Sequence, residues 1–182
     1  MAVMAEKVKT SKPLPIVALA LAWLVPGAGH AYIGRRRRGI IIFVTIGATF
    51  WAGVGLGGVM TVDHRIEPWW FMAEMLAGAH GLLGWSRQKA IYRKLADEPE
   101  IGPLVSPRSS MFMPQQMQID GRLKEMNLVL VYPVDTIARA YAGVAGMLNL
   151  LCIFDATILA IAGVTGEPPL QERKKQTGGD ER

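Results

Sequence analysis

The chain alternates between long apolar stretches and short polar ones, and four of the apolar stretches are long enough to cross a bilayer. They cover residues 14–33, 39–62, 68–86 and 141–165. A helix needs about 20 apolar residues to span the hydrocarbon core. The pattern therefore predicts an all-α integral membrane protein, a bundle of about four transmembrane helices in which residues 14–165 form one membrane domain.

Three polar regions surround these stretches. We expect a polar tail at residues 1–13, a loop at residues 87–135 between the third and fourth spans, and a disordered tail at residues 166–182. Residues 88–96 are expected to continue the third helix into the loop, and the side chain of Asp135 is expected to cap the start of the fourth helix.

A connector between the first two apolar stretches carries the densest charge in the chain. Residues 26–39 read PGAGHAYIGRRRRG. An arginine at the bilayer centre costs about 2.5 to 3.5 kcal/mol, so the four consecutive arginines Arg35, Arg36, Arg37 and Arg38 mark a membrane surface. We interpret the connector as the tight turn of a helical hairpin, with anionic lipid as an expected partner of the arginines.

Basic residues also predict an orientation. With four spans, the arginine turn and the long loop share one side and hold 12 of the 20 lysines and arginines, against 8 on the other. The positive-inside rule then places that turn and loop in the cytoplasm and both termini outside, in a bacterial inner membrane. If the first stretch is re-entrant, the first tail joins the cytoplasmic side and the count becomes 15 against 5. Both arrangements stay open.

Composition excludes several classes of function. The net charge is +5, but the basic residues cluster at the ends of apolar stretches and do not line a soluble face, which argues against nucleic-acid binding. Cys152 is the only cysteine and lies in an apolar stretch, so the chain has no intramolecular disulfide. Because no enzyme signature is present, we expect a protein that is not an enzyme and needs no cofactor.

The connector also carries a family resemblance. Its pattern of spaced glycines, an aromatic residue and a basic residue comprises Gly27, Gly29, His30, Tyr32, Gly34, Arg35 and Gly39, directly after Pro26. This pattern resembles the connector of the two-transmembrane-helix domain family. Residues 145–156, AGMLNLLCIFDA, contain Asn149 and Asp155 and are similar to the last helix of uncharacterised bacterial multipass proteins that share a PGAGHxYxGRR connector. The resemblance implies a membrane family and no activity.

Two histidines are candidates for cofactor binding. His30 and His80 lie on different predicted helices, roughly 8 to 10 Å inside the same boundary by the rise of a helix. Such a pair can ligate haem iron from both faces. The alternative is that each ring forms hydrogen bonds within the protein.

Two carboxylates are candidates for proton or cation conduction. Glu74 and Asp155 fall within predicted spans, where an acid must be paired, protonated or hydrated. They could share a proton or bind a cation. We favour a structural role, with each acid bonded across the bundle to Asn149 or to a backbone carbonyl. The hydroxyl groups of Thr45, Thr49 and Thr157 are expected to bond to carbonyls of their own helices.

Small residues recur at intervals of four in three of the predicted spans. The pairs are Gly53 with Gly57, Ala77 with Gly81, and Ala142 with Gly146. Such faces let membrane helices approach closely. We therefore interpret the protein as an accessory or structural subunit that packs against other membrane helices or against its own copies. The alternative is a small haem-binding or ion-conducting unit that uses the histidines or carboxylates named above.

Overall fold

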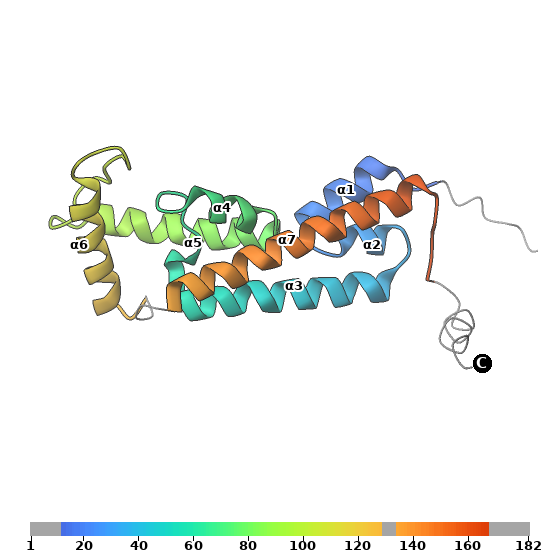
Figure 1. Cartoon of the computed structure of the whole chain (residues 1–182), viewed down its shortest axis with the longest axis horizontal. Coiled ribbons are helices and arrows are strands. Elements are labelled where there is room, and N and C mark those ends of the chain that lie inside the picture. The colour runs from blue at the N-terminus through green and yellow to red at the C-terminus, as the bar shows by residue number, and fades with distance from the viewer. Residues whose placement is uncertain (1–11, 129–133, 168–182) are drawn as a thin grey trace, which may run out of the picture.

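A computed structural model describes residues 12–128 and 134–167 of the chain, without the side chains of residues 59, 134 and 135. Every regular element in the described part is helical (Figure 1). The elements are α1 (Pro15–Leu24), α2 (Ala28–Tyr32), α3 (Arg36–Gly57), a 3-10 turn (Gly58–Thr61), α4 (Pro68–Met75), α5 (Ala79–Ala96), α6 (Phe112–Glu125) and α7 (Val134–Ile161). The all-α prediction is confirmed. The side-chain cap expected at Asp135 and most of both polar tails lie outside what is described.

Helices α3 and α7 run antiparallel along the whole bundle and hold it together (Figure 1). Their small residues face each other, so a Cβ atom added at Gly53 would lie 2.6 Å from the carbonyl oxygen of Ala138 and 2.9 Å from the amide nitrogen of Ala142. One turn further on, a Cβ atom at Gly57 would meet the side chain of Ala138. The missing side chains let the two backbones approach closely.

The first apolar stretch folds back on itself and is not one continuous helix. Helix α1 ends before Pro26, which has no backbone N–H to donate, and Gly27 then adopts a φ of 84° that other residues rarely tolerate. Helix α2 returns along α1, so that the amide of Leu14 donates to the Tyr32 hydroxyl oxygen at 3.3 Å. Both ends of this hairpin therefore lie at the end of the bundle where α3 begins.

The third stretch forms a second hairpin that enters from the opposite end. Helix α4 ends at Met75, and the chain then turns at Gly78, whose φ is 62°. Helix α5 runs back so that Gly81 packs on the carbonyl of Glu74. The tip at Gly78 lies against the carbonyl groups of Trp23 and Leu24 in the last turn of α1. The two hairpins thus meet tip to tip, midway along α3 and α7 (Figure 1).

Within the described residues, two helical segments are long and apolar enough to cross a membrane. They are Arg36–Gly57 and Thr136–Ile161, which belong to α3 and α7. The structure does not confirm four spanning helices, because each hairpin divides its apolar stretch into two pieces at a glycine.

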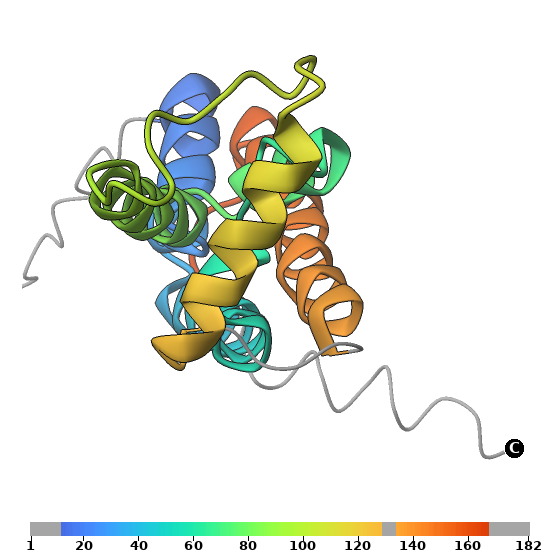
Figure 2. The same cartoon turned by 90° about the vertical axis from the view of Figure 1, so that its left-hand side faces the viewer.

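A small polar cap lies at the end of the bundle away from the arginines. Helix α5 continues to Ala96, as predicted, and α6 crosses the end of the bundle (Figures 1 and 2). Helix α6 falls in the predicted loop and was not expected. The hydrophobic core of the cap joins the 3-10 turn to α5 and α6. It consists of Met60, Tyr92, Leu95, Ile119 and Leu123.

Candidate functional site

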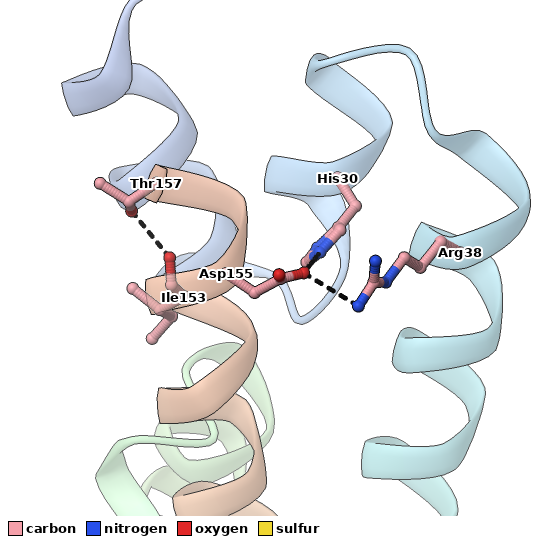
Figure 3. A network of polar contacts seen from close by, with 5 residues as sticks. All are labelled: His30, Arg38, Ile153, Asp155 and Thr157. Atoms are coloured by element: carbon pink, nitrogen blue, oxygen red, sulfur yellow. Dashed lines mark hydrogen bonds and ion pairs between the residues drawn. The ribbon is translucent and has the colours of Figure 1, made fainter. Parts of the chain in front are cut away.

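The main polar site joins three elements at the arginine end of the bundle (Figure 3). The Nε2 atom of His30 in α2 lies 2.8 Å from the Oδ2 atom of Asp155 in α7. An Nη atom of Arg38 in α3 lies 3.0 Å from the same oxygen. The His30 side chain is fully buried, whereas those of Asp155 and Arg38 are 40% and 50% exposed. One carboxylate therefore links the returning half of the first hairpin to both long helices.

Glycines of the connector bring these side chains within reach. A Cβ atom at Gly29 would lie 2.5 Å from the carbonyl oxygen of Ala18 and 3.2 Å from the Cβ atom of Ala156, next to Asp155. Gly27 and Gly39 pack backbone to backbone where α2 meets α3. The spaced glycines thus let α2 lie close to α1, α3 and α7, and this close packing positions His30.

The surroundings of His30 favour one tautomer. Its Nδ1 atom is buried and has no hydrogen-bond partner among the described residues. A buried N–H without an acceptor costs about 1 to 3 kcal/mol. The proton therefore belongs on Nε2, where the ring donates to Asp155, and the positive charge of Arg38 balances the carboxylate.

Asn149 forms a second polar site at the tips of the two hairpins. It is fully buried, and its Nδ2 atom donates to the carbonyl oxygens of Leu76 at 2.8 Å and Ala22 at 3.3 Å. These carbonyls lie at the C-terminal ends of α4 and α1, where helices leave acceptors without intrahelical partners. One amide group on α7 thus caps both hairpins.

The two histidines are held by different partners. The Nδ1 atom of His80 accepts a hydrogen bond of 3.1 Å from the indole N–H of Trp51, and its ring packs against Phe43 and Phe50 of α3. His30 bonds to α7 instead. In each ring the other nitrogen, Nδ1 of His30 and Nε2 of His80, is buried without a hydrogen-bond partner among the described residues.

Asp155 bonds to His30 and Arg38, which the folded-back hairpin brings to it. Within the part of the chain that the structure describes, it bonds neither to Asn149 nor to a backbone carbonyl, the partners that we expected. Glu74 is fully buried in α4, next to Ala73, which packs on Gly146 of α7. Thr49 and Thr157 donate to carbonyls of their own helices at 2.8 and 2.7 Å, as predicted.

The predicted packing residues make their contacts inside this chain. Gly53, Gly57 and Ala142 lie between α3 and α7, and Gly146 lies against the backbone of Ala73 and Ala77. Gly81 closes the second hairpin. These small faces are therefore occupied by neighbouring helices of the same chain.

The remaining connector residues bind the segment after α7. Gly34 has a φ of 88° and lies beside Gly166, whose amide donates to the carbonyl oxygen of Ile33 at 2.9 Å. The amide of Arg37 donates to the Glu167 carboxylate at 2.9 Å.

The described residues near His30 form no metal cluster, and a cavity lies elsewhere in the bundle. No group of three or more histidine, cysteine or carboxylate side chains in the described part of the chain could hold a metal ion. A cavity of about 290 Å³ lies near the other end of α3, lined by residues that include Trp51, Val62, Gly84 and Arg87.

Sequence reasoning missed the pair of His30 and Asp155. In a bundle of four spans, the chain ends and the arginine turn lie on opposite sides, which separates Asp155 from His30. The available signal was the family resemblance, because the two matching stretches contain one member of the pair each.

Comparisons with known proteins agree with an uncharacterised family. A family model described as a family of unknown function, DUF6677, matches residues 17–168. No curated protein and no solved structure matches the chain.

Proposed function

The chain belongs to this family of unknown function, DUF6677, and we propose that it is a small integral membrane protein without enzymatic activity that serves as a structural or accessory subunit. The observation that carries this proposal is the exposure of its two long helices. Of the residues in their most apolar windows, 28% are buried in α3 and 33% in α7. The core helix of a soluble protein buries most of such a window.

The exposed side chains on these helices are large and apolar. They include Ile40, Ile41 and Val44 on α3, and Leu151, Phe154 and Ile158 on α7, all at least 57% exposed. Burying one such side chain is worth about 1.5 to 3 kcal/mol. Lipid or neighbouring membrane helices can cover this surface, whereas water would leave it unfavourably hydrated.

The interior also holds fully buried polar groups, which suits a bilayer. His30, Glu74 and Asn149 are fully buried, although each is polar. In hydrocarbon, polar groups and broken helix ends are tolerated only where protein or a hydrated cavity surrounds them. The hairpin tips meet this condition because Asn149 caps both. The proposed topology is therefore two crossings, by α3 and α7, with one re-entrant hairpin entering from each side.

We place the arginine end of the bundle in the cytoplasm of a bacterial cell. With two crossings, the start of α1, the start of α3 and the end of α7 share one side, which carries 11 of the 20 lysines and arginines. The four consecutive arginines form the N-cap and first turn of a crossing helix, where basic residues affect topology most. In this arrangement, His30, Arg38 and Asp155 form a clamp that closes the cytoplasmic end.

Membrane extraction tests the proposal. The protein should stay in the membrane pellet after alkaline carbonate washing and enter solution only with detergent. Release by carbonate alone would contradict it. Co-purification from native membranes in mild detergent then identifies the neighbouring helices, whether from other subunits or from copies of this chain.

A second function, proton or cation conduction, is favoured by polar residues that lie on α7 or on the helices packed against it. Glu74, Asn149 and the His30–Asp155 pair follow one another from the middle of the bundle toward its arginine end. Flux into liposomes above that of protein-free vesicles, abolished by both Glu74→Gln and Asp155→Asn, would support this function. Flux equal to that of empty vesicles would exclude it.

A further inference from the structure

We infer that the start of α3 is a binding site for the phosphate headgroup of an anionic phospholipid, with Arg36 and Arg37 as its cations. This inference rests on the proposed membrane location. The lipid site adds to that proposal in two ways. It assigns different roles to neighbouring arginines, and it names the segment that competes with the lipid.

The side chains of the connector arginines do not all point the same way. Arg38 points inward to Asp155 and is part of the clamp. Arg36 and Arg37 are exposed, and the structure gives them no ion pair with another described residue. Two adjacent cations at a membrane boundary attract anionic headgroups. Arginine can also bind phosphate oxygens with two parallel hydrogen bonds.

An apolar stripe continues from these arginines down the same face of α3. Ile40 lies four residues after Arg36, Ile41 lies four after Arg37, and Val44 follows by one more turn. These three apolar side chains are 59–65% exposed. A soluble anion would use the arginines alone, whereas a phospholipid can also place an acyl chain along the stripe. The shape of the patch therefore favours lipid.

A carboxylate already occupies part of this position. Glu167 accepts a hydrogen bond from the amide of Arg37 in the first turn of α3. Backbone N–H groups of a first turn lack intrahelical acceptors and carry partial positive charge. A lipid phosphate placed between the two arginines would compete with this carboxylate, which makes Glu167 an internal competitor for the headgroup.

Lipid binding to the purified full-length protein in a nonionic detergent tests the inference. Native mass spectrometry gives the affinity for phosphatidylglycerol and, for comparison, for phosphatidylcholine. The Arg36→Gln/Arg37→Gln variant should lose about 25-fold in affinity for phosphatidylglycerol, which corresponds to ~1 kcal/mol per arginine. The matched control is Arg93→Gln/Lys94→Gln, which removes two exposed cations of α5 at the other end of the bundle and should leave the affinity unchanged.

Two further arms identify the ligand and the competitor. Glu167→Gln should raise the affinity for phosphatidylglycerol severalfold, and millimolar inorganic phosphate should not displace the lipid. Equal losses in the arginine variant and its control, displacement by phosphate, or an unchanged affinity in Glu167→Gln would each overturn the inference. Carbonate extraction tests the proposed membrane location separately. If the protein stays in the pellet but does not select phosphatidylglycerol, only the lipid site is contradicted.

Discussion

His30 and Asp155 are 125 positions apart in the chain, yet their side chains meet at 2.8 Å where the first hairpin contacts the last helix. Arg38 binds the same carboxylate oxygen from the start of α3. This contact closes one end of the bundle, because it joins the hairpin that begins the bundle to the helix that ends it.

The pair should stabilise the protein in a way that a double-mutant cycle can measure. We expect His30→Ala and Asp155→Asn each to lower the free energy of unfolding by about 1 to 3 kcal/mol, since each leaves a polar partner unsatisfied. The double variant should lose less than the sum, with a coupling of about 0.5 to 3 kcal/mol. Thermal unfolding in detergent provides the measurement. Strictly additive effects would show that the contact contributes nothing.

Replacing Asn149 should lower the free energy of unfolding strongly, because its one side chain bonds to two helices. Replacing it with leucine removes the donor to Ala22 and Leu76 and leaves two buried carbonyls without this partner. At about 1 to 3 kcal/mol for each unsatisfied group, we expect a loss of ~2 to 6 kcal/mol. The matched control is Cys152→Ser, one turn further along α7. A midpoint of thermal unfolding in Asn149→Leu that equals that of the control would contradict the proposed cap.

Two glycines of α3 should respond oppositely to the same substitution. Gly53→Ala places a methyl group against the backbone of Ala138 and Ala142, so we expect a loss of about 1 to 3 kcal/mol. Gly55 has open space around its Cβ position, and Gly55→Ala should be neutral or stabilise the helix by about 0.5 to 1 kcal/mol. Both are compared with the wild type by thermal unfolding. Similar losses in the two variants would mean that α3 and α7 do not pack as described.

Asp120 in the cap should make stability depend on pH. Partial desolvation raises the pKa of its carboxyl group above the ordinary value of 3.8, although a hydrogen bond from Gln116 opposes the shift. A raised pKa means that the protonated acid favours the folded state at low pH, and that this contribution is lost as the pH rises through the folded-state pKa. In the Asp120→Asn variant, the side chain stays uncharged at every pH. The variant should therefore unfold at a higher temperature than the wild type, and the difference between their midpoints should be larger at pH 7 than at pH 4. A constant difference across this range would exclude the effect.

The sequence predicts the helical class and several contacts, but not the path of the chain. The spacing of Gly53 and Gly57 identifies the face that α3 presents, and Pro26 locates the break in the first stretch. Apolar content alone does not distinguish a helix that crosses a bilayer from two shorter helices that fold back, because both satisfy the same composition. In the third stretch, the chain folds back at Gly78. Its positive φ and its contact with α1 show this, and the sequence reveals neither.

Helix α6 was missed for a different reason. Its residues include Pro114 and several glutamines, and its buried face is completed by Met60 and Tyr92 from distant parts of the chain. Tertiary packing rather than local propensity therefore determines this helix.

The central claim is that the chain crosses the membrane twice, and cysteine accessibility tests it most directly. Single cysteines at Lys12, Arg36, Ser110 and Thr165 are introduced into a Cys152→Ser background and labelled with an impermeant maleimide before and after permeabilisation of whole cells. Two crossings with two re-entrant hairpins predict that Lys12, Arg36 and Thr165 behave alike and are protected in intact cells, whereas Ser110 is labelled from outside. If Arg36 and Ser110 instead label together and opposite to Lys12, the first stretch spans the membrane and the two-crossing account is wrong.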